Sequence, residues 1–257
     1  MYKLPQELTD YIIDFLYDDF ETLRQTSLVS KAWLKCSRYH LFETLSMEYL
    51  KLMELGQADL ATPCNHVRKL SLVWISDPTK VSFMLSNFRE SKIRTLVIIS
   101  RRAYQVHQPS IRQGFSTFPC ARITSLEFRS VFYKTRMFLA VISLLPNIDN
   151  LTIAVYGCND DEHSKPNKEF MNDIIFPSFR GCLRLTNPRG WQSLGYGSTD
   201  MLHLLAHMPI RFHTVSLSVN KHNLGIVSSF FDTCAPTVQR ITLSTVHCKP
   251  SSHFRGV

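Results

Sequence analysis

The six residues Val67-Arg68-Lys69-Leu70-Ser71-Leu72 set a pattern that the chain repeats. In this pattern an apolar residue is followed by two polar ones and then by an apolar-polar-apolar triplet. It returns at 93–98, 123–128, 148–153, 212–217 and 238–243, with a poorer copy at 182–185. The steps between equivalent positions are 26, 30, 25, 32, 32 and 26 residues. The alternation in the second half of each copy predicts a short strand with one buried face.

Apolar segments with helical spacing lie between most of these strands, at 81–88, 137–145, 170–175, 201–207 and 224–231. Several end near a proline, which stops a helix before the next strand begins: Pro146, Pro177, Pro209 and Pro236. One strand and one helix per repeat resembles a leucine-rich-repeat solenoid. The resemblance implies an α/β fold with a parallel sheet whose strands follow the order of the sequence.

The resemblance is incomplete, because the usual Asn or Cys after the second leucine is not regularly present. We therefore expect an irregular solenoid in which the asparagine ladder is missing or replaced. The alternative is an ordinary α/β domain whose parallel strands share one pattern. Strand order separates the two, since it is sequential in a solenoid.

The segment ahead of the repeats predicts a small helical unit. Leu4-Pro5-Gln6-Glu7-Leu8 places a proline in the first turn of a short amphipathic helix. Asp19 and Ser30 are suitable N-caps for two further helices. Three helices in under fifty residues are too few to bury all the apolar surface of this segment. We therefore expect the segment to dock onto a partner.

The residues of this unit resemble an F-box, and the whole chain is similar to fungal F-box proteins. The resemblance rests on Leu-Pro-x-Glu-Leu at 4–8, an Ile/Phe-Leu pair eight residues on, and Leu-Val-Ser-Lys-x-Trp at 28–33. It implies that this segment binds a Skp-type adaptor and, through it, a cullin scaffold. The implied adaptor contacts are Leu4, Pro5, Glu7, Leu8, Ile12, Phe15, Leu16, Leu23, Leu28, Val29 and Trp33. A three-helix cap whose apolar residues fill its own core is the alternative.

The expected organisation has three parts. Residues 1–46 form the F-box, 47–66 a connecting helix or loop, and 67–257 a degenerate leucine-rich-repeat-like substrate-binding domain. A helix is expected at 50–60, and no linker rich in Gly or Ser separates the parts. We therefore expect a rigid join.

No catalytic constellation is present. The sequence holds no Gly-x-Ser-x-Gly, His-Glu-x-x-His or Walker-type motif, and its Cys/His pairs at 64–66 and 247–248 are too far apart to share a zinc ion. We expect no enzyme activity, no cofactor and no metal. Seven cysteines without a Cys-x-x-Cys pair indicate reduced thiols in the cytoplasm or nucleus. The longest apolar runs are too short to span a membrane, and no secretory signal opens the chain.

Charge is unevenly divided along the chain. The first 46 residues hold five Lys/Arg and seven Asp/Glu, which leaves 24 and 14 of the 29 and 21 for the remainder. The basic residues are scattered, so a solvated mixed face is favoured over a nucleic-acid site. The outward strand positions form a mixed polar set: Lys69, Ser71, Thr95, Thr124, Glu127, Arg129, Thr152, Ser216 and Thr242.

Two longer loops stand out, an acidic one at 157–168 and a glycine-rich one at 186–199. The second holds Arg189, Trp191 and Tyr196, a composition typical of binding hot spots, so these are the expected substrate contacts. The alternative is that Trp191 folds back to cover the edge of the solenoid.

Together these features favour a substrate-receptor subunit of an SCF-type (cullin-RING) ubiquitin ligase. One alternative is an F-box scaffold that holds a partner without ubiquitin transfer. A less favoured alternative is a basic solenoid that binds nucleic acid. The sequence does not identify the protein substrate.

Overall fold

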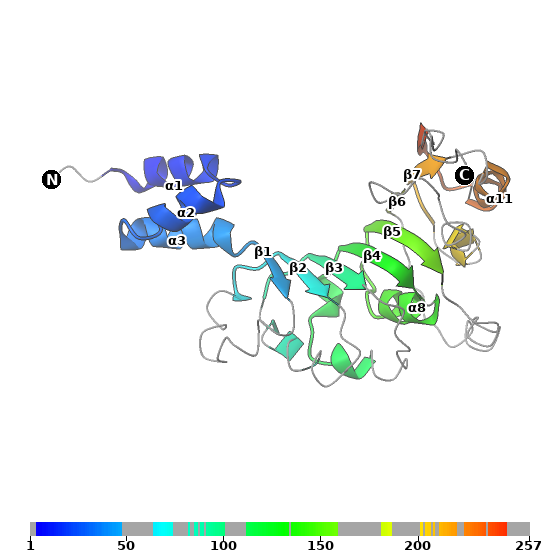
Figure 1. Cartoon of the computed structure of the whole chain (residues 1–257), viewed down its shortest axis with the longest axis horizontal. Helices are drawn as coiled ribbons and strands as arrows, with labels where there is room; N and C mark the ends of the chain where they lie inside the picture. Colours follow the sequence, from blue (N-terminus) through cyan, green and yellow to red (C-terminus); the bar gives the residue numbers. More distant parts are fainter. Residues whose placement is uncertain are drawn as a thin grey trace, which may run out of the picture.

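Three helices followed by an eight-stranded sheet make up the computed structural model of the chain (Figure 1). It describes residues 4–47, 64–73, 82, 85, 86, 88, 89, 91–100, 112–133, 135–158, 181–186, 201, 202, 204–206, 208, 211–219, 224–234 and 236–245. In the described part of the chain no helix is long and apolar enough to cross a membrane.

The N-terminal unit consists of α1 (Gln6–Phe15), α2 (Phe20–Thr26) and α3 (Lys31–Leu41). Both expected caps are confirmed. The Asp19 carboxylate accepts a hydrogen bond from the backbone N–H of Thr22 at 3.0 Å, and the Ser30 hydroxyl accepts one from Trp33 N–H at 3.3 Å. Each cap satisfies one backbone donor that the helix leaves free. Pro5 stands just before α1, at its N-cap.

The eight strands form one parallel sheet in which each strand pairs only with its neighbours in the sequence. The strands are β1 (Thr44–Met47), β2 (Lys69–Val73), β3 (Thr95–Ser100), β4 (Ser125–Tyr133), β5 (Asn150–Cys158), β6 (Cys182–Leu185), β7 (Thr214–Val219) and β8 (Arg240–Thr245). All seven strands expected from the repeated pattern are present, the poorer copy at 182–185 included. The parallel α/β architecture is confirmed, and the strand order is the sequential one that a solenoid requires.

The sheet also contains β1, a strand that the sequence analysis missed. Residues 42–47, Phe-Glu-Thr-Leu-Ser-Met, carry the same pattern as the later copies, and Leu45 lies in register with Leu70. The pattern was overlooked because it directly follows the third helix and was assigned to the helical unit. The expected domain boundary after residue 46 therefore falls inside a strand of the sheet.

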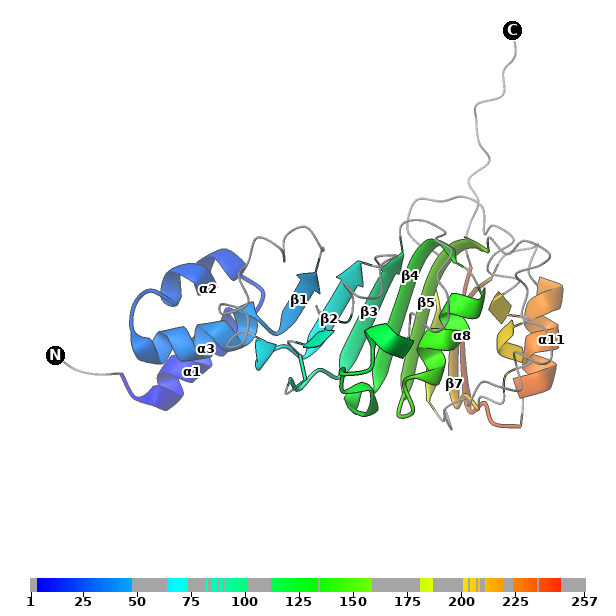
Figure 2. The same cartoon turned by 90° about the horizontal axis from the view of Figure 1, so that it is seen from below.

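Helices cover the outer side of the curved sheet, which leaves the inner side as a strand face (Figures 1 and 2). They include α8 (Thr135–Ser143) and α11 (Leu224–Cys234), and a short 3-10 turn, η1 (Cys120–Arg122), precedes β4. The core lies between this layer and the sheet, where Phe128 of β4 meets Phe138 of α8 edge to face with ring centroids 5.5 Å apart. The expected helices at 50–60 and 170–175 lie outside the described residues, and those at 81–88 and 201–207 are described only in part.

A ladder of backbone hydrogen bonds joins the repeats at the point where each strand begins. The carbonyl of Glu43 accepts from both Arg68 and Lys69 N–H at 2.9 Å, and the Arg68 carbonyl accepts in turn from Arg94 and Thr95. Carbonyls at the equivalent place in later repeats continue the series: Arg94, Thr124, Asp149, Gly181 and His213. This ladder is carried by main-chain groups, so it does not depend on the side chains at these positions.

Gly181 is the position where two neighbouring repeats approach most closely. A Cβ atom there would lie 1.6 Å from the carbonyl oxygen of Asp149. The same oxygen accepts a hydrogen bond from Cys182 N–H at 2.7 Å. The ladder therefore needs a residue without a side chain at 181.

Candidate partner-binding surface

The outer face of α1 carries four large apolar side chains that no described part of the chain covers. Leu8, Tyr11, Ile12 and Phe15 follow the spacing of one helical face, and their exposed fractions are 51%, 72%, 40% and 79%. The opposite side of the same helix holds Ile13, which is fully buried. The helix thus has one apolar side for its own unit and a second that remains exposed to solvent.

Further apolar residues are exposed beside this helix and at the turn between α2 and α3. Leu28 and Val29 in the turn are 85% and 65% exposed, and Leu4 ahead of α1 is 48% exposed. Pro5 and Glu7 are exposed as well. An exposed apolar pair in a turn stabilises nothing within its own chain, which is typical of a surface that a partner covers.

The remaining adaptor contacts implied by the F-box resemblance lie deeper in the unit. Leu23 of α2 is fully buried, and Leu16 and Trp33 are half-buried. Leu23 packs inside the three-helix unit and offers no surface to a partner. Three exposed aromatic residues were missed by the sequence analysis: Tyr11, Tyr17 and Phe20. The helical spacing of Tyr11 from Leu8 and Phe15 was the signal that could have identified the first of them.

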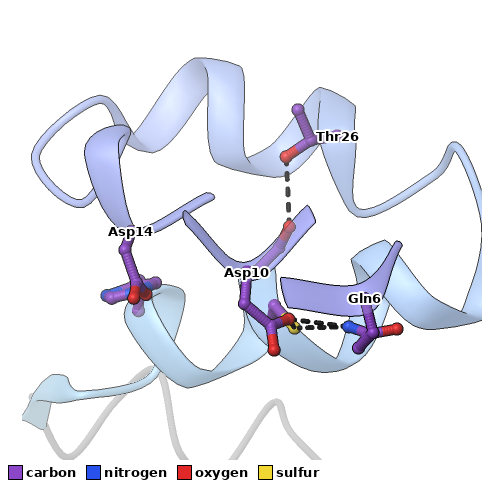
Figure 3. A network of polar contacts seen from close by, with 7 residues as sticks. Gln6, Asp10, Asp14 and Thr26 are labelled. Atoms are coloured by element: carbon purple, nitrogen blue, oxygen red, sulfur yellow. Dashed lines mark hydrogen bonds and ion pairs between the residues drawn. The ribbon is translucent and has the colours of Figure 1, made fainter. Parts of the chain in front are cut away.

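A seam of polar contacts holds α1 against α3 (Figure 3). The Cys36 thiol donates to a carboxylate oxygen of Asp10 at 2.6 Å, and the Gln6 amide donates to the same oxygen at 2.7 Å. One turn further along, the His40 ring and the Asp14 carboxylate lie 2.7 Å apart. Because these pairs join two helices at fixed positions, they fix the orientation in which the apolar face of α1 is presented.

The contacts of this seam shift the pKa values of Cys36 and Asp10. Burial, together with the hydrogen bond to Asp10 and the negative charges of Asp10 and Asp14, raises the pKa of Cys36 to about 11. The hydrogen bonds from Cys36 and Gln6 lower the pKa of Asp10. At neutral pH the proton therefore resides on the thiol, and Asp10 is the charged acceptor.

The helical unit joins the sheet without a flexible connection. Only Phe42 and Glu43 separate α3 from β1, and the carbonyl of Glu43 is the first acceptor of the backbone ladder. Above this joint the guanidinium of Arg68 lies 5.0 Å from the centre of the Tyr39 ring, a cation–π contact between the sheet side and α3. The rigid join expected from the sequence was assigned to 47–66, and most of that segment lies outside the described residues.

The strand face of the sheet carries an ion-pair cluster. Glu127 of β4 accepts from Arg129, with its Oε1 at 2.7 Å from Nε and 2.6 Å from Nη2. Its other oxygen lies 3.7 Å from the Lys69 ammonium of β2. A single carboxylate thus faces two cations.

The expected substrate contacts Arg189, Trp191 and Tyr196 lie outside the described residues. Within the described ranges no group of three His, Cys, Asp or Glu residues could hold a metal ion. Burial raises the pKa of Cys64 and of Cys120 to about 11, and it also raises that of Cys234. These thiols are therefore protonated and weakly nucleophilic at neutral pH.

Comparison with known proteins finds no family model and no curated protein that matches the chain.

Proposed function

We propose that the chain is a substrate-receptor subunit of an SCF-type ubiquitin ligase. In this proposal the three-helix unit is an F-box that binds a Skp-type adaptor, and the sheet is a degenerate leucine-rich-repeat solenoid that holds a protein substrate. A cullin scaffold is recruited through the adaptor. The chain itself supplies no catalytic group.

The apolar face of α1 is the observation that carries the proposal. Leu8, Tyr11, Ile12 and Phe15 expose large side chains from a helix that already has a buried side. The unit therefore does not need these residues for its own core. Covering such surface contributes about 25 cal/mol per Å², so several large side chains suffice for a specific interface.

The pattern of residues 4–8 and 28–33 supports the identity of the partner, because it is the part of the sequence that resembles an F-box. Most of the implied contacts are exposed in the folded unit, Leu4, Leu8, Phe15, Leu28 and Val29 among them. The raised pKa values of Cys36, Cys64 and Cys120 disfavour a thiolate that would accept ubiquitin. Both observations favour a receptor over an enzyme.

A capture experiment with purified components tests the proposal. The full chain with Leu8→Ala, Ile12→Ala and Phe15→Ala loses three exposed apolar contacts, each worth about 1 kcal/mol or more. We expect its affinity for a purified Skp-type adaptor to fall by roughly 100-fold or more. The three positions are exposed, so circular dichroism should show an unchanged fold.

The matched control replaces exposed apolar residues at the far end of the chain, with Leu224→Ala and Leu243→Ala, which are 56% and 54% exposed in the parent chain. This variant should bind the adaptor like the parent. Equal adaptor binding by all three proteins would rule out the α1 face as the interface.

Ubiquitin transfer is tested separately in a reconstituted ligase. A receptor makes modification of at least one captured protein depend on the chain, whereas a scaffold leaves every captured protein unmodified. A captured set without any chain-dependent modification would favour the scaffold alternative.

A further inference from the structure

We infer that the strand face of the sheet binds an extended acidic segment of a protein partner, whose carboxylates contact cations placed on every second strand. As a statement about substrate class, this inference rests on the proposed receptor function. The binding itself can be measured without the adaptor.

The cations follow a regular arrangement across the sheet. Side chains on this face alternate with those that enter the core, so the relevant positions are the ones between the core residues. Four of them are basic, and they come from the four even-numbered strands: Lys69 of β2, Arg129 of β4, Arg184 of β6 and Arg240 of β8. Neighbouring strands lie about 4.8 Å apart, and Arg129, Arg184 and Arg240 are each offset by two residues along the strands, so these three cations form a diagonal row with steps of about 12 Å.

The strands between them carry no charge on this face. Their outward residues are small, polar or apolar, and Val97 among them is buried: Thr44 and Ser46 of β1, Thr95, Val97 and Ile99 of β3, Asn150, Thr152 and Ala154 of β5, and Thr214 and Ser216 of β7. Small side chains leave room for another backbone to approach, and hydroxyls can hydrogen-bond to it. No described helix lies on this side, because α8 and α11 cover the outer one (Figure 1).

The charge on this face is not balanced internally. Glu127 is the only carboxylate among the residues of the eight described strands, and Lys69 and Arg129 already contact it. Arg184 and Arg240 are exposed and form no ion pair within the described part of the chain. Even with Glu127 counted, the face has a net charge of +3, which attracts an acidic partner and repels a basic one.

The spacing between the cations specifies how far apart the carboxylates of an extended ligand must lie. An extended chain advances about 3.3 Å per residue, so carboxylates three or four residues apart recur at about 10 to 13 Å. A segment that crosses the strands along this diagonal with an acidic residue at every third or fourth position would therefore meet Arg129, Arg184 and Arg240 in turn.

Fluorescence anisotropy with the full chain tests this directly. The probe is a labelled twelve-residue peptide, Glu-Ser-Ser repeated four times, and the matched peptide has Gln in place of Glu. We expect the acidic peptide to bind at low salt with an affinity that falls as salt rises, and the Gln peptide not to bind. The double variant Arg184→Gln/Arg240→Gln should bind the acidic peptide at least tenfold more weakly.

Glu127→Gln provides a test of opposite sign. It removes the only carboxylate of the face and frees two cations, so affinity for the acidic peptide should rise at least threefold. The control is Arg89→Gln, which removes an exposed arginine outside the strands and should change nothing. Equal binding by the parent chain and the double variant, or no binding by the parent chain, would overturn the inference.

Two further measurements separate this inference from nucleic-acid binding and from the proposed adaptor binding. A labelled single-stranded oligonucleotide that bound more tightly than the peptide and was lost in the same double variant would reassign the face to nucleic acid and contradict the inference. Adaptor capture by the double variant should equal that of the parent chain. The α1 variant should still bind the peptide, so failure of one proposal is distinguishable from failure of the other.

Discussion

Cys36 and Asp10 hold α1 against α3 through one short contact, the thiol donating to the carboxylate at 2.6 Å. The geometry makes the thiol a structural donor and removes it as a nucleophile, because burial and the neighbouring carboxylate both oppose formation of a thiolate. A carboxylate beside a cysteine therefore has the opposite effect from the cation that a reactive cysteine requires.

Alkylation of Cys36 should report this contact. Its pKa is about 11 against an ordinary value of 9.0, so its rate of reaction with iodoacetamide should rise with a midpoint near pH 11. Asp10→Asn removes the negative charge and should move the midpoint toward 9. Peptide mapping by mass spectrometry gives the rate for each cysteine.

Cys64 is the internal control, because burial alone raises its pKa. Its midpoint should be the same in the parent chain and the Asp10→Asn variant. A Cys36 midpoint near 9 in the parent chain, or one that Asp10→Asn leaves unmoved, would contradict the assigned contact.

The same contact marks a limit of sequence reasoning at the residue scale. Asp19 and Ser30 were identified as caps because a cap bonds to a backbone group only a few residues away. The Cys36 and Asp10 side chains lie 26 residues apart, and only the packing of α1 on α3 brings them together. A local sequence pattern could not predict that Asp10 is the hydrogen-bond partner of Cys36.

Among the elements, β6 is a four-residue strand that begins directly after a glycine, Gly181. Its first ladder contact runs from Cys182 N–H to the Asp149 carbonyl at 2.7 Å, and the Gly181 carbonyl accepts from His213 at 3.1 Å. A methyl group at 181 would overlap the Asp149 oxygen, so the two repeats would have to separate.

Gly181→Ala should destabilise the sheet by about 2 kcal/mol or more, as expected for steric overlap at a close-packed backbone. Urea denaturation followed by circular dichroism measures the change. The matched control is Gly225→Ala, since a Cβ there meets nothing within 4 Å. The control should be neutral or slightly stabilising, because alanine favours the helical state of α11. Equal stability of the two variants would show that the close approach at 181 is absent.

The strands illustrate what a repeated pattern can predict. Seven of the eight were identified because each copy carries an apolar-polar-apolar triplet, whose two apolar residues in β2 are the buried Leu70 and Leu72. Residues 42–47 carry the same sequence pattern, but their position directly after a helix concealed the copy. The sequential strand order was implied by the solenoid resemblance and stayed open against an ordinary α/β domain until the structure showed it. The backbone ladder at the strand starts is carried by main-chain groups and leaves no sequence signature.

At the scale of the whole molecule, the helical unit and the sheet are joined through Phe42 and Glu43, with Arg68 stacked on Tyr39 beside the joint. A short join of this kind would hold a bound adaptor and a bound substrate at a fixed distance. The sequence identified the residues of α1 but not which of them are buried and which are exposed, because periodicity alone cannot distinguish an inward face from an exposed one. Leu23, implied as a contact by the resemblance, is buried, whereas Tyr11 is exposed.

Hydrogen exchange of the full chain, alone and with saturating Skp-type adaptor, tests the central claim most directly. We predict slower amide exchange at residues 4–16 and 27–33, where the exposed apolar side chains lie, and unchanged exchange in β2 to β8. Protection of the strands without any change in the helical unit, or no protection at all, would contradict the account.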